Sequence, residues 1–539
     1  MEIKFFGATE GVTGSNQMLI AGDVKILLDC GLFQGSEEEE KKNSESFPYD
    51  PNEIDFLILG HAHIDHSGRI PKLVKDGFRG RIISHQATME LSDIMLRDSA
   101  HIQANDAEWE NRKRERSGLP LVEPLYTEDD VSDSMKLFEG YYYDQLISLT
   151  ENIKIRFRDA GHILGSCITE IFVKEDDKEI KIVYAVDIGM PNHSIISSPE
   201  FIEDCDYLII ESTYGDRTHE SYDESHHKLM RIVRDTVLQG GTVIIPSFAV
   251  GRTQEIVYAF NSYYDRGEGE FELPDVPIYV DSPMAVDVTE VFMKNAGSFD
   301  EITKKMINEG DNPFLFKNIH YVRDVDGSRR LNENNDPKVV ISSSGMATAG
   351  RVRHHLKHNL WKKKTSVVFV GYQAQGSLGR LLIDGIKRVR LFGEDIQVNS
   401  NIYSLEGMSA HADREFLLEW ISHIKRKPKK VFLVHGESDA KHTLKTLIER
   451  LFLLPVTVAK KGMTVELTAG LETAEIAENS AEIKTEVADK IRQLKEGLSI
   501  FESGLNADGM NVEDFVKLNN RLIEMQQAVI DLQMQHNTN

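Results

Sequence analysis

The stretch Gly60-His61-Ala62-His63-Ile64-Asp65-His66-Ser67-Gly68 places three imidazoles and one carboxylate within six residues. It follows directly on residues 54–59, an apolar run that predicts a buried strand, so we expect a loop at the carboxyl end of that strand. These polar groups cannot all be ordinary core residues, because each would need a hydrogen bond or a metal. Zinc binds His nitrogens and Asp oxygens, and catalytic zinc sites keep a position for water. The stretch therefore predicts a metal site.

The chain as a whole is acidic and has a globular composition. Its 539 residues include 62 Lys and Arg against 87 Asp and Glu, a formal net charge of −25, and 40% are hydrophobic. This composition excludes wholesale disorder, and the charge argues against a protein that coats nucleic acid or an anionic membrane by bulk charge. No apolar run approaches the roughly 18 residues of a membrane span, and the N-terminus lacks a signal-peptide pattern. The three cysteines are too few for a disulfide framework and are expected to be packed thiols, so we expect a cytoplasmic protein.

The pattern along the chain indicates an α/β protein. Short strand patterns occupy residues 4–29, the acidic run at 37–40 is expected to be a solvated loop, and residues 86–118 are expected to be helical. From about residue 205, strands alternate with helices near 222–238, 251–264 and 284–296. Such alternation predicts a parallel sheet in an α/β layer.

The tail after residue 470 shows two amphipathic helical patterns, in which apolar residues recur at steps of three and four. Two interpretations remain open. The helices form either an arm for a homodimer or a cap on their own domain, because periodicity does not identify the partner.

Three further motifs follow the order of a known superfamily. Asp29 comes after an apolar strand pattern, His162 lies in Asp159-Ala-Gly-His-Ile-Leu-Gly-Ser, and Asp187 lies in Tyr184-Ala-Val-Asp-Ile-Gly. With His-x-His-x-Asp-His at 61–66, they resemble the motifs of the metallo-β-lactamase superfamily.

Three more motifs make the resemblance narrower. Glu211 lies in Glu-Ser-Thr-Tyr-Gly-Asp, His411 in Ser-Ala-His-Ala-Asp, and His435 in Leu-Val-His-Gly-Glu. They resemble the extra motifs of the β-CASP RNA nuclease family, and the chain is similar to the cleavage and polyadenylation specificity factor endonuclease subunit and its prokaryotic relatives. A His at the last motif marks RNA-directed members of that family, so His435 favours RNA.

The resemblance implies a fold and a division into domains. Residues 1–210 and 401–465 would form a metallo-β-lactamase αββα sandwich, and residues 211–400 an inserted β-CASP α/β domain. Residues 470–539 would be a helical hairpin extension that the resemblance does not cover.

The resemblance also implies two zinc ions. One would be held by His61, His63 and His162, and the other by Asp65, His66 and His435. Asp187 would bridge the two ions. Asp29 would orient the ligands from outside, a role that such carboxylates commonly have.

This arrangement implies a hydrolytic reaction on RNA, in RNA processing or decay. A pair of metals suits in-line attack of hydroxide on a phosphodiester, and Asp65 would be catalytic through the metal that it holds. His411 is suited to protonate the leaving oxygen, because an imidazole is partly charged at neutral pH. Glu211 would keep His411 protonated and oriented.

Other segments are candidates for phosphate contacts. Ser343, Ser344 and Gly345 lie in a small-residue turn between a predicted strand and helix, where backbone N–H groups can approach a phosphate. Arg252 is either a phosphate contact or an ion pair at a helix start, and Arg351 follows the turn. Residues 351–390 carry ten basic residues against one acidic residue, although Lys362–Lys364 could equally be a solvated face. We expect His354, His355 and His358 on the surface.

The leading hypothesis is an endoribonuclease, and three alternatives compete with it. Within the same class, the chain could be a 5′-to-3′ exoribonuclease of the ribonuclease J type. A different class is a non-catalytic RNA-binding scaffold, but relatives of that kind have lost zinc ligands that this chain retains. Hydrolysis of a small ester or lactam would not account for the basic stretch, His411 or the large insertion.

Overall fold

The computed structural model describes residues 1–175, 178–267 and 271–468. The helical extension expected at 470–539, and with it the possible homodimer through these helices, lies outside the described residues. Among the helices that are described, none combines the length and apolar character that a membrane span requires.

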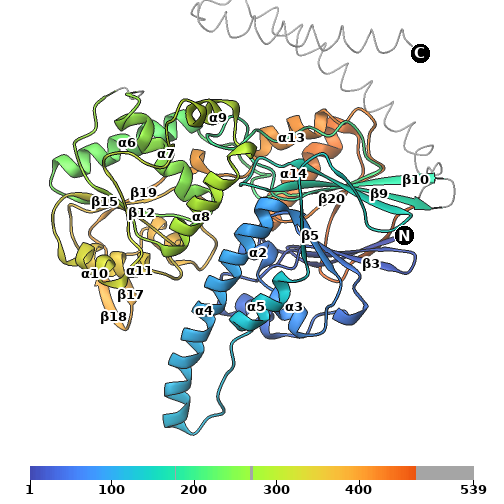
Figure 1. The fold of residues 1–539 in the computed structure, drawn as a ribbon, viewed down its shortest axis with the longest axis horizontal. Helices are drawn as coiled ribbons and strands as arrows, with labels where there is room; N and C mark the ends of the chain where they lie inside the picture. The colour runs from blue at the N-terminus through green and yellow to red at the C-terminus, as the bar shows by residue number, and fades with distance from the viewer. Residues whose placement is uncertain (176–177, 268–270, 469–539) are drawn as a thin grey trace, which may run out of the picture. The chain divides into compact units, whose positions relative to one another are not determined.

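The first of two seven-stranded sheets carries the loop with the cluster of histidines (Figure 1). In spatial order its strands are β22 (Thr464–Glu466), β1 (Glu2–Gly7), β2 (Asn16–Ala21), β3 (Val24–Leu28), β4 (Phe56–Ile58), β5 (Arg81–His85) and β6 (Phe138–Tyr141). Neighbours from β22 to β3 are antiparallel, and those from β3 to β6 are parallel. The strand predicted at 54–59 is β4, which is shorter than expected.

The second sheet is also mixed. In spatial order its strands are β21 (Val456–Val458), β20 (Lys430–Leu433), β11 (Tyr207–Ile210), β10 (Lys178–Ala185), β9 (Cys167–Glu175), β8 (Ile153–Asp159) and β7 (Leu146–Ser148). Strands from β21 to β10 are parallel, and those from β10 to β7 are antiparallel.

The two sheets pack face to face and are covered by helices outside. Side chains such as Phe5 and Ile26 meet Phe157 and Ile182 of the second sheet in a buried core. The helices of this part are α1 (Glu37–Lys41), α2 (Ile64–Ser67), α3 (Ile70–Lys75), α4 (Gln86–Ser117), α5 (Glu128–Met135), α13 (Arg414–Ser422) and α14 (Ser438–Phe452). Apolar residues of α3 pack on the first sheet, and those of α13 and α14 pack on the second. The expected αββα sandwich is confirmed.

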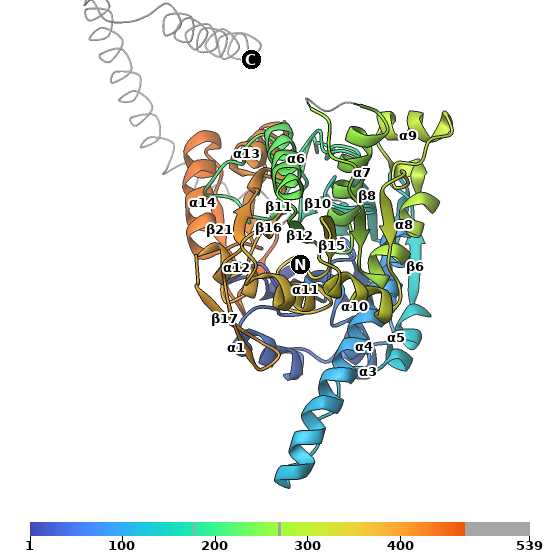
Figure 2. The same cartoon turned by 90° about the vertical axis from the view of Figure 1, so that its left-hand side faces the viewer.

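A third sheet is entirely parallel and has six strands (Figure 2). In spatial order they are β14 (Ile319–Tyr321), β13 (Ile278–Val280), β15 (Lys338–Ser342), β12 (Thr242–Pro246), β16 (Ser366–Phe369) and β19 (Asn401–Ser404). Its associated elements are α6 (Tyr222–Leu238), α7 (Arg252–Tyr264), α8 (Pro283–Lys294), α9 (Glu301–Asn308), α10 (Val325–Glu333), α11 (Val352–Asn359), α12 (Leu378–Ile383) and the hairpin of β17 (Arg388–Leu391) and β18 (Glu394–Gln397). The predicted alternation of strands and helices is confirmed, with α6, α7 and α8 at the expected places.

Helix α4 joins the sandwich to the domain of the parallel sheet. It packs against α8, and Lys294 of α8 makes an ion pair of 2.7 Å with Glu90 of α4. Its second half extends away from both sheets (Figure 1). The helix predicted at 86–118 is therefore confirmed. It is one of the elements that hold the two domains against each other.

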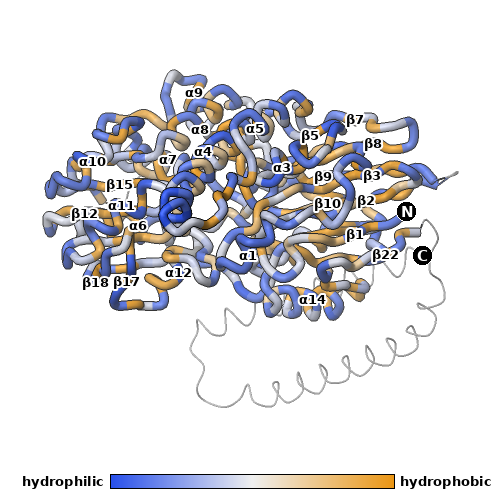
Figure 3. Tube along the Cα trace, turned by 90° about the horizontal axis from the view of Figure 1, so that it is seen from below, coloured by the Kyte–Doolittle hydropathy of each residue, from blue (hydrophilic) through white to orange (hydrophobic). Residues whose placement is uncertain are grey.

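Two smaller expectations have different outcomes. The acidic run at 37–40, expected as a loop, belongs to α1, whose first turn is capped by the Ser36 hydroxyl accepting from the Glu39 N–H at 3.3 Å. A capping serine before consecutive glutamates favours a helix start, and this signal was overlooked. Figure 3 shows hydrophilic residues along α1 and hydrophobic segments among the strands. The cysteines are buried free thiols, as expected.

Candidate metal centre

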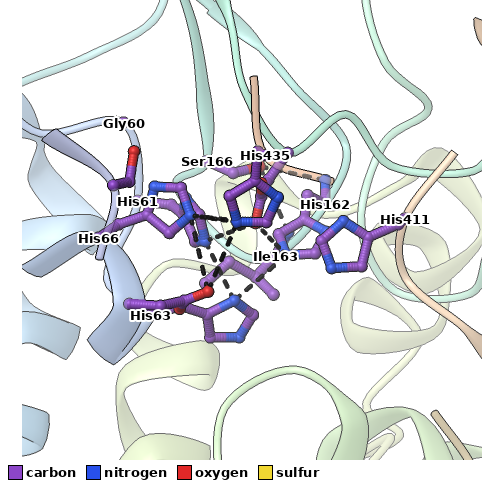
Figure 4. A network of polar contacts seen from close by, with 12 residues as sticks. Gly60, His61, His63, His66, His162, Ile163, Ser166, His411 and His435 are labelled. Atoms are coloured by element: carbon purple, nitrogen blue, oxygen red, sulfur yellow. Dashed lines mark hydrogen bonds and ion pairs between the residues drawn. The ribbon is translucent and has the colours of Figure 1, made fainter. Parts of the chain in front are cut away.

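The predicted ligands lie on loops that follow strands of both sheets. The run 61–66 comes after β4 of the first sheet, whereas His162, Asp187 and His435 come shortly after β8, β10 and β20 of the second. Because these strands end at the same side of the sandwich, their loops meet there. Figure 4 shows the imidazoles converging from three separate segments.

One group consists of His61, His63, His162 and Asp187. Nδ1 of His63 lies 3.0 Å from Nε2 of His61 and 3.2 Å from Nε2 of His162. One ligand atom from each of the four side chains falls within 4.8 Å of the others. The Ala410 carbonyl oxygen lies 3.4 Å from Nδ1 of His162 and can accept a hydrogen bond from its N–H, which leaves Nε2 of His162 free to bind a metal.

A second group consists of Asp65, His66 and His435. Nε2 of His66 lies 3.2 Å from Nε2 of His435 and 3.9 Å from Oδ2 of Asp65. Asp187 lies between the two groups: its Oδ2 is 3.3 Å from Nε2 of His61 and 3.4 Å from Nε2 of His66. The structure therefore brings together all seven predicted ligands in two adjoining sets that share Asp187.

The chemistry of these side chains fits a metal. Burial lowers the pKa of His63 to about 4 and holds the pKa of His61 and His162 well below the usual range, so all three are neutral ligands at pH 7. Nε2 of His63 is buried and has no hydrogen-bond partner among the described residues. Its other nitrogen, Nδ1, faces Nε2 of His61 and of His162, and a metal between these neutral nitrogens would satisfy all three.

The charge around His66 also fits a bound metal. Burial opposes its protonation, but Asp187, Asp29 and Asp65 together raise the pKa of His66 well above its usual range. Three carboxylates thus surround the position of His66, and its imidazolium supplies part of the charge that compensates them. A bound cation would supply that charge instead, and binding would release the His66 proton.

Asp29 lies behind the ligands, as predicted. Its Oδ2 is 2.7 Å from Nδ1 of His66 and accepts from the Tyr184 hydroxyl at 2.7 Å and the Ser15 hydroxyl at 3.1 Å. Its Oδ1 accepts from the Gly60 N–H at 2.9 Å, which ties the carboxylate to the start of the ligand loop. The contact with Nδ1 directs Nε2 of His66 toward the metal position.

Glu211 and His411 form a separate pair beside the first group. Nδ1 of His411 lies 3.2 Å from Oε2 of Glu211, and Oε1 of Glu211 accepts from the Ile188 N–H at 2.6 Å. The ring of His411 lies 4.5 Å, centroid to centroid, from that of His162. Burial disfavours the imidazolium, yet Glu211 and then Asp187 raise the pKa of His411 to about 9. Asp187, Glu211 and His411 also have ligand atoms within 4.8 Å of one another, so they form a third set that could hold a metal.

The ligands open into a small cavity that adjoins a larger one. The catalytic cavity, of about 130 Å³, is lined by Asp65, His162, Asp187, His411 and His435 and by residues of the parallel-sheet domain. A neighbouring groove of about 620 Å³ shares Tyr372 and Gln34 with it. Because both domains line the catalytic cavity, the site depends on how the inserted sheet sits against the sandwich.

Of the candidate phosphate contacts, some line the cavity and others do not. Arg252 lines the cavity and is paired with Glu255, so both of the roles considered for it remain open. The turn of Ser343, Ser344 and Gly345 follows β15, but none of these three residues lines the cavity, and their contact with phosphate stays a prediction. A Cβ on Gly345 would lie 2.8 Å from the Phe248 ring, so this glycine lets Phe248 reach the cavity.

Arg351 lies away from the cavity. Its guanidinium donates to Oδ1 of Asp281 at 2.7 Å and to the Arg323 carbonyl at 2.8 Å. With these contacts, a structural role for Arg351, in which it holds the turn in place, is favoured. A role as a phosphate contact has less support. The other basic residues between 351 and 390 are also absent from the lining of the cavity, since they lie on α11, α12, β17 and the turns between these elements.

His355 corrects an expectation. It was expected on the surface with His354 and His358, which are exposed, but His355 is buried. Its Nε2 lies 2.6 Å from Oδ2 of Asp281, and its Nδ1 lies 2.9 Å from Oδ1 of Asn332. The prediction was wrong because the partner carboxylate comes from the end of β13, far away in the sequence.

Sequence reasoning missed several residues around the site. Tyr184 binds Asp29, and the Thr213 hydroxyl lies 3.1 Å from Nδ1 of His435. Tyr184 stands three residues before Asp187 and Thr213 stands two residues after Glu211, each inside a motif given above. Their place in these motifs could have marked them as neighbours of the site. Nothing in the sequence marked Tyr372, which lines the cavity and donates a hydrogen bond to Glu437 across the two domains.

The fold and the cluster define a metallo-hydrolase of the metallo-β-lactamase superfamily. Family models described as metallo-beta-lactamase superfamily domain, Beta-Casp domain and Zn-dependent metallo-hydrolase RNA specificity domain match residues 18–210, 253–382 and 395–459. The chain is 36% identical over 467 residues to Ribonuclease TTHA0252 of Thermus thermophilus, covering 87% of this chain and 98% of that protein.

Two relatives from Methanocaldococcus jannaschii extend the comparison. An RNase J-like protein is 31% identical over 463 residues, covering 85% of this chain and 98% of the relative. The transcription termination factor FttA is 29% identical over 465 residues, covering 84% of this chain and 69% of that factor. The chain belongs to the β-CASP family of the metallo-β-lactamase superfamily.

Proposed function

We propose that this protein is a zinc-dependent ribonuclease that cleaves RNA internally, with two zinc ions at the paired ligand groups and His411 as general acid. The observation that carries the proposal is His411, which lines the same small cavity as the shared carboxylate Asp187 and is held from behind by buried Glu211. His435 and the names of two relatives, a ribonuclease and an RNase J-like protein, favour RNA as substrate.

Each residue of the site has a defined part in this proposal. When bound, the metals would supply a water nucleophile at neutral pH and neutralise charge on the phosphoryl oxygens. Asp29 orients His66, and Asp187 balances the charge of both metal positions. His411 holds a proton at neutral pH and donates it to the leaving oxygen, while Glu211 fixes the ring through Nδ1.

Internal cleavage is distinguished from 5′-to-3′ exonuclease action by circular RNA. A circle has no end, so an endonuclease of this kind is expected to linearise it and then to degrade the product. The measurement is electrophoresis of a labelled circle and of a linear 5′-monophosphate strand of the same sequence. Digestion of the linear strand with an intact circle would contradict internal cleavage and would favour the ribonuclease J type.

The alternatives from other classes have less support. A non-catalytic RNA-binding scaffold needs neither a full ligand set nor the Glu211–His411 pair, and this chain has both close together. Hydrolysis of a small ester or lactam needs no second domain at the cavity, whereas Phe248, Arg252 and Tyr372 of the inserted domain line it here.

Replacing Glu211 by glutamine is expected to shift the pH dependence of cleavage. A general acid works while it is protonated, so activity is lost as pH rises through its pKa. Glu211 is the largest contribution that raises the pKa of His411, so Glu211→Gln lowers that pKa and moves the alkaline loss of kcat/KM to lower pH. The measurement is kcat/KM against pH for both proteins. An alkaline limb at the same pH in both would contradict the coupling.

A further inference from the structure

A basic groove lies at the amino-terminal ends of the central strands β12 and β16 of the six-stranded sheet. It has a volume of about 390 Å³, and its lining includes Trp361, Lys362, Lys363, Lys364 and Asn335. We call it the lysine groove. None of the residues that line it is acidic, in a chain whose net charge is −25.

The sheet connects this groove to the catalytic cavity. Thr242, at the start of β12, and Thr365, directly before β16, line the lysine groove, whereas Phe248 and Tyr372, shortly after the ends of the same strands, line the catalytic cavity. Figure 2 shows β12, β15 and β16 together in the middle of this domain. The five residues of β12 span about 17 Å at roughly 3.3 Å per residue, so the two sites are separate.

Trp361 presents an indole at the mouth of this groove. Its side chain and backbone together are 54% exposed, and Asn399 fixes its backbone by donating to the Trp361 carbonyl at 3.1 Å. Nζ of Lys362 lies 5.8 Å from the ring centroid. An isolated exposed apolar residue is ordinary, but here the exposed ring stands next to three consecutive lysines.

The lysines carry charge that no carboxylate of the described residues compensates. Lys362 donates to the neutral side chains of Asn335 and Asn359, each at 3.0 Å. In the part of the chain that the structure describes, no carboxylate pairs with Lys362, Lys363 or Lys364, although nearby Lys357 pairs with Glu394 at 2.6 Å. Lys363 and Lys364 are exposed and free to contact an anion.

A fourth lysine shows how concentrated the positive charge is. Lys338, at the start of β15, is buried and donates to the Asp336 carbonyl at 3.1 Å. Burial and then the positive charge of Lys362 lower the pKa of Lys338 to about 8, although the Asp336 charge acts in the opposite direction. A bound polyanion would relieve this repulsion.

The region next to the metal site does not offer such charge. The groove of about 620 Å³ that adjoins the catalytic cavity is lined by four carboxylates, Glu10, Glu39, Glu437 and Asp439, and by two lysines. That lining repels a phosphate backbone. Of the three cavities described, the lysine groove is the one with a basic lining free of carboxylates.

We propose that the lysine groove is a second binding site for single-stranded RNA, in which a base stacks on Trp361 and phosphates contact Lys363 and Lys364. The proposal rests on the proposed ribonuclease function. Exposed aromatic rings beside lysines bind single strands without regard to sequence, because every base has a flat face and every nucleotide a phosphate. A long substrate would occupy both sites, and a short one only the catalytic cavity.

Cleavage of two RNA lengths tests this site. One RNA is too short to reach from the catalytic cavity to the groove, and the other is long enough to do so. For Trp361→Ala we expect the ratio of kcat/KM for long over short RNA to fall about tenfold, as loss of one base stack implies. In the double variant Lys363→Ala, Lys364→Ala, the binding of long RNA should depend less on salt. The slope of the logarithm of the binding constant against the logarithm of the salt concentration should fall by about two.

The matched control is Trp109→Ala. Trp109 is 62% exposed with Lys113 over its ring, but Lys113 lies 3.6 Å from the Glu110 carboxylate, so its charge is compensated. We expect the long-to-short ratio to be unchanged in this variant. Equal effects of Trp361→Ala on both RNA lengths, or no effect on either, would overturn the second site. Absence of cleavage of both RNAs by the wild type would instead refute the ribonuclease proposal.

Tryptophan fluorescence tests binding at the groove without relying on cleavage. In a protein carrying Trp109→Phe and His411→Ala, the remaining indoles are Trp361 and the buried Trp420, which donates to the Glu200 carbonyl at 2.9 Å. Long single-stranded RNA should quench the emission, and salt should reverse the quenching. No quenching by RNA, or equal quenching by inorganic phosphate at the same phosphate concentration, would overturn the proposal.

Discussion

Replacing Asp187 by asparagine is expected to remove bound zinc and to abolish RNA cleavage. Oδ2 of Asp187 approaches His61 at 3.3 Å, His66 at 3.4 Å and His162 at 3.6 Å, so one carboxylate serves both ligand groups. The amide keeps the shape but removes the charge that balances the cations. Because a metal contributes several kcal/mol to transition-state stabilisation, we expect cleavage to fall by at least about 10³-fold. The measurements are metal content per chain and kcat/KM.

The control for this change is Asp206→Asn. Asp206 is also buried, but it lies at the start of β11, where it accepts from the Lys181 N–H at 2.8 Å and pairs with Arg426. Its replacement is expected to lower the free energy of unfolding while leaving the zinc content unchanged. Full zinc content and cleavage in Asp187→Asn would contradict the assignment of Asp187 as the shared ligand.

Replacing His411 by alanine is expected to slow cleavage by about 10²–10⁴-fold while zinc stays bound, as loss of a general acid implies. His411 belongs to neither of the two ligand groups that contain the other imidazoles, and its own partner is Glu211. An RNA whose leaving group is a good nitrophenolate needs no proton, so its cleavage should be much less affected. The measurement compares kcat for the two substrates and zinc content for the two proteins.

His423→Ala is the matched control for His411. His423 lies at the end of α13, in the same segment of the chain, and stacks on Phe201 at 3.7 Å away from the ligands. It should leave cleavage unchanged. An equal loss on both leaving groups in His411→Ala, or loss of zinc from that variant, would show that His411 holds the site together and does not act as the acid.

The ligand set and the sandwich were predicted from the resemblance to a known family, and that resemblance rests on short local motifs. His61, His63, Asp65 and His66 stand in one loop after one strand, and the remaining ligands each follow an apolar strand pattern. The division into domains at 210, 400 and 465 stays a prediction, although β19 extends the six-stranded sheet to Ser404 through its pairing with β16.

What the sequence could not reveal depends on contacts between distant segments. Tyr184 reaches Asp29 across 155 residues, and His355 reaches Asp281 across 74, so neither partner is visible in a local pattern. The basic stretch at 351–390 was predicted to offer phosphate contacts, but its position in the fold was not visible in the sequence. Three of its lysines, Lys362, Lys363 and Lys364, line a groove completed by residues near 241 and 335, which only the folded chain brings together.

The central claim, metal-dependent hydrolysis of RNA at the His–Asp cluster, is tested most directly by removing and restoring the metal. The purified protein is treated with a chelator, its zinc content is measured, and cleavage of a labelled RNA is followed before treatment, after treatment and after zinc is added back. We expect cleavage to disappear with the zinc and to return with it. Undiminished cleavage by a protein shown to hold no metal would contradict the account.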